Sequence, residues 1–226
     1  MNIYDFLCKT SIVGMNAILV AGLGTASAEA ALINFDTDAN GQSINASGLF
    51  IDTTRLTELY APLGVNFSGP GGNNGGAILN QAGNFGVNAR SGLNFLAFNR
   101  DSTLSDGGVS ADPETISFDT LLNSVSIFAS GGDKTATSTL EAFDMNNLLV
   151  GSNTITPQSG TYGQLSVSSA SGSISRIVLS AEGDNAFVYD DLSFTPVPEP
   201  SSVLGTLAFG VLGTAYYVLK RSLKKG

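Results

Sequence analysis

The pattern that most constrains the fold is a series of short apolar runs between residues 32 and 194, broken by Gly, Asn, Asp and Ser. In Val125-Ser126-Ile127-Phe128-Ala129, apolar residues stand at every second position, as a strand with one buried face requires. Turn residues recur about every ten positions, which is typical of antiparallel sandwiches. The pattern therefore predicts one all-β domain over residues 29–195, an antiparallel β-sandwich or jelly roll.

The apolar runs define the expected strands, and one segment is expected to be helical. A short helix is predicted at about Thr54–Tyr60, because Asp52 to Thr54 offer capping side chains and Pro62 ends it. Ser68–Gly76 is rich in Gly and Asn and is expected to be a surface loop. The expected strands are Ile33–Phe35, Gly64–Phe67, Leu93–Phe98, Glu114–Phe118, Ser124–Phe128, Thr139–Phe143, Gln164–Val167, Arg176–Leu179 and Phe187–Phe194.

The N-terminus has the features of an export signal. Lys9 precedes the charge-free apolar run Ser11–Gly24, and Ala26-Ser27-Ala28 has the small-x-small pattern of a cleavage site. We predict that residues 1–28 form a signal helix that is cut after Ala28, with Ala28-Glu29-Ala30 as the alternative site. An uncleaved N-terminal anchor is the other interpretation of this segment.

Composition excludes several kinds of active site. The chain has no His and a single Cys, Cys8, which would be removed with the signal. Ser-His-Asp and Cys-His triads, His-ligated zinc or copper sites, His-ligated haem and disulfides are therefore excluded from the mature protein. We predict that the protein is not an enzyme.

Charge narrows the range of partners. Residues 29–200 carry five Lys and Arg against eighteen Asp and Glu, a net charge of −13. Phosphate backbones require clustered Lys and Arg, so no nucleic-acid partner is expected. An acidic surface is compatible with oxygen ligation of hard cations such as Ca²⁺.

The C-terminus carries three consecutive features that indicate membrane targeting. Pro198-Glu199-Pro200 cannot be helical and predicts an exposed, extended spacer. The uncharged run 203–219 is seventeen residues long, at the short end of a transmembrane helix. Four cations follow, which predict a cytoplasmic tail with the rest of the chain outside; they are Lys220, Arg221, Lys224 and Lys225. An ordinary C-terminal anchor with a Pro-containing stalk is the alternative.

Residues 196–226 resemble the PEP-CTERM sorting signal of exopolysaccharide-producing Gram-negative bacteria and cyanobacteria, since the Pro-Glu-Pro motif, the apolar helix and the basic tail occur in that order. The resemblance implies recognition by an exosortase, a membrane enzyme that would remove the tail near Pro198, Glu199 and Pro200. It implies only transient anchoring in the inner membrane. It does not identify the domain upstream, because very different domains carry this signal.

The domain itself resembles secreted bacterial jelly-roll domains that precede such signals, some of them akin to carbohydrate-binding modules. Ile33-Asn34-Phe35-Asp36, Leu59–Ser68 and Phe187–Phe194 carry this resemblance. It implies that the first and last strands lie side by side and that a structural Ca²⁺ can bridge them. The candidate ligands are Asp36, Asp38, Asp190 and Asp191.

Alternatives to these sites remain open. Adjacent strand residues face opposite sides, so one of Asp190 and Asp191 is expected to face solvent. Instead of binding Ca²⁺, Asp191 could cap backbone N–H groups or pair with Arg176 or Arg100. Paired carboxylates of a glycosidase could come from Glu58, Glu114, Glu141 or Glu182, and glycan contact could come from Tyr60, Tyr162 or Tyr189.

Together these features predict an exported, non-catalytic protein of the cell envelope or extracellular matrix. Its expected role is structural or adhesive within an exopolysaccharide matrix. A Ca²⁺-dependent lectin-like module is the alternative function, and a carboxylate-dependent polysaccharide hydrolase or lyase is a further one. The only cofactor expected for any of these three functions is the candidate Ca²⁺.

Overall fold

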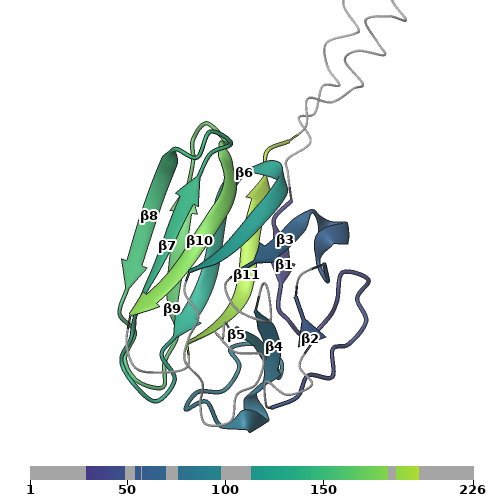
Figure 1. Ribbon diagram of the computed structural model, residues 1–226, viewed down its shortest axis with the longest axis vertical. Coiled ribbons are helices and arrows are strands. Elements are labelled where there is room, and N and C mark those ends of the chain that lie inside the picture. The colour runs from purple at the N-terminus through teal and green to yellow at the C-terminus, as the bar shows by residue number, and fades with distance from the viewer. Residues whose placement is uncertain are drawn as a thin grey trace, which may run out of the picture. The chain divides into compact units, whose positions relative to one another are not determined.

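The structure is a computed structural model that describes residues 29–48, 54–56, 58–69, 76–97, 113–182 and 187–198 (Figure 1). The chain divides into two units, one made of residues 1–27 and 198–226 and the other of residues 28–197. The predicted signal helix and the predicted transmembrane helix with its basic tail lie outside the described residues. Within the described part of the chain, no helix has the length and apolar character needed to cross a bilayer.

The described domain is all-β with antiparallel strand pairing, as the sequence predicted. Two 3₁₀ turns, η2 (Ala61–Leu63) and η3 (Gln81–Gly83), interrupt the strands. The strands are β1 (Ala31–Ile33), β2 (Thr54–Arg55), β3 (Val65–Ser68), β4 (Ala77–Asn80), β5 (Asn94–Ala97), β6 (Glu114–Ser130), β7 (Thr137–Phe143), β8 (Leu149–Ile155), β9 (Gly163–Ser168), β10 (Ile174–Glu182) and β11 (Val188–Pro196).

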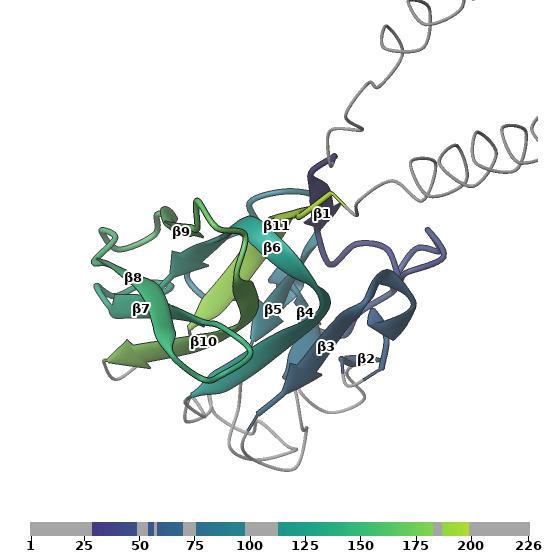
Figure 2. The same cartoon turned by 90° about the horizontal axis from the view of Figure 1, so that it is seen from above.

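Strand β6 joins the two halves of the sheet. Its N-terminal half pairs with β3 and β10, and beyond β10 the order continues through β7 to β8. Its C-terminal half pairs with β9 on one side and with β11 on the other. Figure 2 shows β6 passing from the strands β3 and β10 towards β11. One long strand therefore belongs to both layers.

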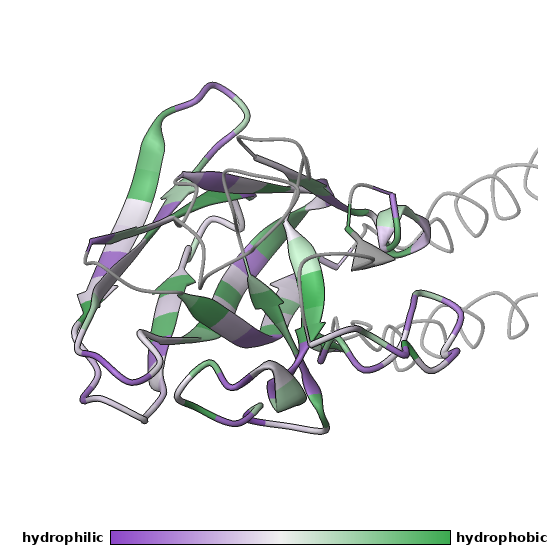
Figure 3. Ribbon diagram, turned by 60° about the horizontal axis from the view of Figure 1, so that its bottom comes forward, coloured by the Kyte–Doolittle hydropathy of each residue, from purple (hydrophilic) through white to green (hydrophobic). Residues whose placement is uncertain are grey.

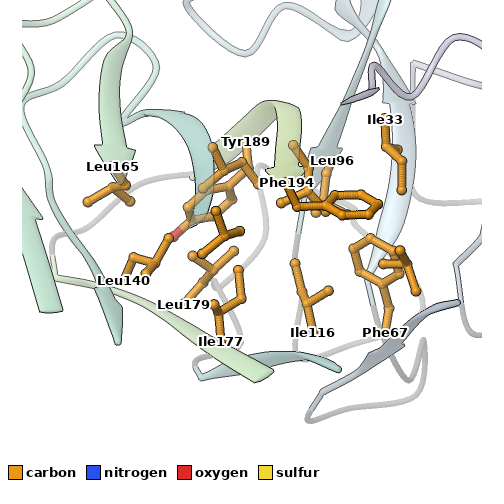
Figure 4. Packing of buried hydrophobic residues seen from close by; sticks show 14 of the residues in the cluster. Ile33, Phe67, Leu96, Ile116, Leu140, Leu165, Ile177, Leu179, Tyr189 and Phe194 are labelled. Carbon is orange, nitrogen blue, oxygen red and sulfur yellow. The ribbon is translucent and has the colours of Figure 1, made fainter. Parts of the chain in front are cut away.

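The main core lies between these layers. Leu140, Leu165, Ile177, Leu179 and Tyr189 come from four different strands and are buried together, as Figure 4 shows. Bands of hydrophobic and hydrophilic residues along the strands are visible in Figure 3. Each fully buried Leu or Ile stabilises the fold by about 1.5–3 kcal/mol relative to an exposed one.

A second, smaller core lies on the opposite face of β4, β5 and β11. Its buried members are Ala77, Leu79, Phe95, Ala97 and Val188. Side chains of the segment between η3 and β5 pack on it, together with Tyr162. This segment, residues 84–93, is called the covering loop below. Because both faces of β4 and β5 are covered, all four residues of β5 are buried.

Some expected elements differ from the observed ones. The predicted helix at Thr54–Tyr60 is wrong: the described residues there form β2 and a turn, followed by η2. Pro62 lies within η2 and has no N–H to donate, and η2 is closed by i+3 bonds, such as that from Leu63 N to Tyr60 O at 2.9 Å. The predicted strands Glu114–Phe118 and Ser124–Phe128 are one strand, β6.

Candidate functional site

The candidate site lies on β11 at the point where its neighbour changes. β5 pairs with β11 at Val188 and Tyr189, and β1 pairs with it from Leu192 to Phe194. Both are antiparallel to β11, so the end of β1 meets the start of β5 along the same edge. This junction is the carboxylate seam, defined by Asp36, Asp190 and Asp191 with their partners Arg90 and Ser91.

A β-bulge in β11 places both aspartates on the seam. Asp190 pairs with Phe128 of β6 and Ser193 pairs with Ser126, so three steps along β11 match two along β6. Asp191 has a left-handed backbone, φ 51°, as one residue of a bulge commonly does. Both carboxylates are buried and contact the covering loop, so the expectation that one faces solvent is wrong. The alternation rule fails here because the bulge adds one residue.

Asp190 holds the covering loop through backbone hydrogen bonds. Its Oδ2 accepts from the N–H of Arg90 at 2.7 Å and from the N–H of Ser91 at 3.1 Å. Its Oδ1 accepts from the N–H of Asp191 at 2.8 Å. The side chain is fully buried, so these bonds replace the water that it loses.

Asp191 forms the ion pair of the seam. Its Oδ2 accepts from Nη1 of Arg90, and its Oδ1 accepts from the hydroxyl of Ser91 at 2.7 Å. The Arg90 guanidinium also lies 3.5 Å from the centroid of the Phe128 ring, which adds a cation–π attraction. The Arg90 side chain is 41% exposed and that of Asp191 is 6% exposed. Arg90 thus covers a carboxylate that is otherwise removed from water.

Asp36 holds the other end of the same segment. Its Oδ1 accepts from the N–H groups of Leu93 at 2.9 Å and Asn94 at 3.2 Å, where β5 begins. Its Oδ2 is buried and has no hydrogen-bond partner among the described residues. That oxygen lies against Gly92, whose φ is +55°. The three carboxylates therefore secure the segment from Arg90 to Asn94 against β1 and β11.

Burial changes the acid–base properties of this region. It raises the pKa of Asp190 to about 7; the charge of Asp191 adds to the rise, and the N–H groups of Ser91, Arg90 and Asp191 oppose it. Burial, followed by the charges of Asp190 and Asp191, also raises the pKa of Tyr162. Its hydroxyl is buried and has no hydrogen-bond partner in the described part of the chain. Tyr162 thus lies close enough to the carboxylate seam for the charges of its aspartates to raise the pKa of the phenol.

Stability should depend on pH through Asp190. The unfolded pKa, 3.8, is below the folded value of about 7, so the folded state binds more protons between these values. The free energy of unfolding should therefore fall as pH rises from about 4 to about 7, by at most about 1.4 kcal/mol per pH unit from this group. Denaturant unfolding at a series of pH values measures this slope.

The variant Asp190→Asn keeps the shape and removes the titration. Subtracting its stability from that of the unmodified chain should leave a difference that falls over the same pH range. Asp119→Asn, the same substitution at an exposed position, is the matched control for the chemical change itself. A flat difference for Asp190→Asn would show that Asp190 does not carry the elevated pKa.

The four aspartates predicted to bind Ca²⁺ do not form one cluster. Asp38 caps its own turn, accepting from the N–H of Asn40 at 2.8 Å and of Gln42 at 2.9 Å. Asp36, Asp190 and Asp191 accept from protein donors along the covering loop. No group of three or more His, Cys, Asp or Glu suited to a metal ion occurs among the described residues. The donors to these carboxylates are backbone N–H groups, the Ser91 hydroxyl and the Arg90 guanidinium, and N–H groups and a guanidinium bind a carboxylate but repel a cation.

Asp191 pairs with an arginine, as one alternative held, but this arginine is Arg90, and it is Asp190 that accepts from backbone N–H groups. Arg176 instead stacks on Phe143 at 4.0 Å from the ring centroid, and Arg100 lies outside the described residues. Arg90 was missed because it comes from a loop 101 positions away in the sequence. No local pattern in the sequence marks such a contact.

Several of the other candidate side chains are buried in the domain. Tyr60 and Tyr189 are buried in the main core, so neither presents a ring face to a glycan. Glu114 is the buried first residue of β6. Glu58 is exposed. The Pro-Glu-Pro motif, by contrast, is described only as far as Pro198.

Comparison with protein-family models and with curated proteins finds no match. Among solved structures, the chain is similar to the K2 cleaved adhesin domain of Lys-gingipain, with 11% identity, a TM-score of 0.44, and coverage of 74% of this chain and 99% of that one. It is also similar to a DUF4465 family protein from Bacteroides caccae, with 12% identity, a TM-score of 0.42, and coverage of 79% and 97%. A family 6 carbohydrate-binding module matches with 12% identity, a TM-score of 0.29, and coverage of 74% and 94%. At these values the likeness assigns neither a function nor a site.

Proposed function

We propose that this chain is an exported, non-catalytic protein with a jelly-roll-like β-sandwich domain. An exosortase-type enzyme recognises its C-terminal signal and removes it while the helix at 203–219 holds the chain in the inner membrane. The domain then reaches the cell envelope or extracellular matrix. There it has a structural or adhesive role alongside exopolysaccharide.

The observation that carries this proposal is the pair of targeting patterns that flank one domain. The N-terminus has the charge, apolar run and small-residue site of a signal peptide, and the C-terminus has the Pro-Glu-Pro spacer, apolar run and basic tail. The two patterns lie at opposite ends of the chain and favour the same destination. A domain without His, and without Cys after processing, is suited to such an environment.

The geometry of the carboxylate seam supports a non-catalytic role. A hydrolase needs a general acid and a second carboxylate that both reach the substrate. Asp190 is fully buried and held by three backbone N–H groups, and Asp191 is covered by Arg90. The raised pKa of Asp190 thus accompanies a structural role in holding the covering loop. A lectin-like function would need ring faces other than those of Tyr60 and Tyr189.

The sorting step can be tested in an exosortase-producing host. Replacement of Pro198, Glu199 and Pro200 by Ala should leave the tail uncleaved and keep the protein in the inner-membrane fraction, because the spacer recognised by the protease is lost. Mass spectrometry of the purified protein and fractionation of the cells measure both effects.

The matched control replaces the neighbouring Ser201 and Ser202 by Ala, and its mass and location should equal those of the unmodified protein. Unchanged processing and location of the Pro-Glu-Pro variant would refute the sorting role. An intact, uncut chain in the cytoplasm would refute export itself.

A further inference from the structure

Strand β8 forms a free edge of the sheet (Figure 1). It pairs with β7 through residues 149–155, and no other described strand pairs with it. Its neighbour in the other layer, β9, has part of its own edge covered, because Asn153 accepts from the N–H of Ser166 at 3.1 Å. The outer backbone groups of β8 have no such cover among the described residues. They can therefore pair with another strand.

β8 lacks most of the features that protect sheet edges. Proteins commonly blunt an edge with short strands, charged side chains, Pro or bulges. β8 has seven residues, which makes it the longest described strand that pairs on one side only. It contains no charged residue and no Pro. Its one irregularity lies near the β7–β8 turn, opposite Phe143, and the pairing of Gly151 to Ile155 is regular.

Charge favours association through this edge. The domain has a net charge of −13 over residues 29–200, yet residues 145–175, which include β8 and β9, carry no charge. The acidic side chain nearest in register is Glu141 on β7, opposite Ser152. If two copies paired through β8, their β7 strands would lie about 14 Å apart, three strand spacings. That exceeds the Debye length of about 8 Å at physiological salt, so the acidic domains would repel one another little.

The turn before β8 presents apolar side chains in a fixed conformation. Met145, Leu148 and Leu149 are 72%, 65% and 55% exposed, three of the six large exposed hydrophobics in the described residues. Asp144 fixes this turn by accepting from the N–H groups of Asn146 and Leu148, both at 2.8 Å. Such side chains at the end of an open edge add area that a partner can bury.

We propose that β8 pairs with β8 of a second copy of this chain, in antiparallel orientation, so that the sheet continues across a two-fold axis. The regularly paired part of β8, Gly151 to Ile155, suits such self-pairing about Ser152, because it is uncharged and contains no Pro. A two-fold axis at Ser152 would place the two Ser152 residues opposite each other and Gly151 of each copy opposite Asn153 of the other. The inference depends on the sheet edge alone and not on export or sorting.

The test compares single lysine variants of the full chain in mild detergent by sedimentation. Ser152 is exposed, and its side chain has no hydrogen bond to any described residue, so Ser152→Lys should leave the fold intact. It would set two cations opposite each other at the axis. The unmodified chain should dimerise reversibly, and Ser152→Lys should weaken that dimer at least about tenfold.

Thr120→Lys is the matched control, since Thr120 is an exposed strand residue of β6 and should leave the dimer unchanged. Circular dichroism confirms that both variants are folded. A monomeric unmodified chain, or a dimer equally insensitive to both lysines, would overturn the proposal. A monomeric chain whose β8 edge bound lipid vesicles or a neutral glucan would show that this edge binds another partner, and it would also overturn the proposal.

A cysteine variant tests the register by an independent measurement. In a chain with Cys8→Ser, Ser152→Cys provides the only thiol. Residues facing each other across antiparallel strands have Cα atoms about 4.5–5.5 Å apart, within disulfide range. Mild oxidation should therefore link two copies, whereas Asn40→Cys, an exposed position outside β8, should not. Equal linkage of both variants would contradict the register.

Discussion

Replacing Arg90 by Ala should lower the free energy of unfolding by about 2–4 kcal/mol. The change leaves the buried carboxylate of Asp191 without its cation, and breaking a buried ion pair in this way typically costs about 3–5 kcal/mol. We take a smaller value because the Arg90 side chain is 41% exposed and solvent screens part of the interaction. Denaturant unfolding at neutral pH measures the difference.

Arg176→Ala is the matched control for this prediction. Both arginines lie over a phenylalanine ring, Arg90 at 3.5 Å and Arg176 at 4.0 Å from the centroid. Only Arg90 has an ion pair with a buried carboxylate in the described structure. Arg176→Ala should therefore cost about 0.5–1 kcal/mol, the value of an exposed cation–π contact.

A second substitution separates charge from packing. Asp191→Asn in the Arg90→Ala background removes the unpaired charge and should recover part of the lost stability, which a double-mutant cycle would report as coupling. Equal losses for the two arginine variants, with no recovery, would mean that the ion pair contributes nothing beyond ring stacking.

Gly92→Ala should destabilise the domain by about 2–4 kcal/mol. A left-handed backbone costs Ala about 1 kcal/mol, and Gly92 has φ +55°. The added methyl group would also collide with the Asp36 carboxylate. Moving that carboxylate breaks its hydrogen bonds to the N–H groups of Leu93 and Asn94, at a cost of about 1–3 kcal/mol.

Gly41→Ala separates the two contributions. Gly41 has φ +77°, and no atom lies within 4 Å of the position that its methyl group would take. It should therefore cost only the backbone term of about 1 kcal/mol. In an Asp36→Ala background, Gly92→Ala should cost no more than this control. If the two glycine variants were equal in the unmodified background, the contact between Asp36 and Gly92 would not be tight.

The strands that were predicted and those that were missed differ in their exposure. β7 alternates along its whole length and β10 alternates from Arg176 to Ser180, so the period of two reveals them. β4 was missed because it is buried on both faces and too short to be recognised without alternation. β8 was missed because Gly151, Ser152 and Asn153 interrupt its apolar residues at an edge where little burial is required.

The candidate site was only partly predictable. Asp36, Asp190 and Asp191 were selected by sequence, and the structure does bring them to one segment of the covering loop. Their partners were not predicted, because Arg90 and Ser91 reach them only after the whole sheet has formed. The expectation of a metal rested on the resemblance to jelly-roll modules and on the carboxylates, and the sequence could not reveal the N–H groups that donate to them.

By itself, the sequence determined the strand class, the absence of His-based chemistry and the two targeting patterns, because each depends on local periodicity or composition. Tertiary structure alone decided what the acids do. The β-bulge at Asp191 interrupts the alternation of side chains along β11, so that both aspartates face the covering loop. The junction between β1 and β5 brings residues about 100 positions apart into contact. It also decided that β8 is an edge, since edge position depends on the order of strands in the sheet and not on any one strand's sequence.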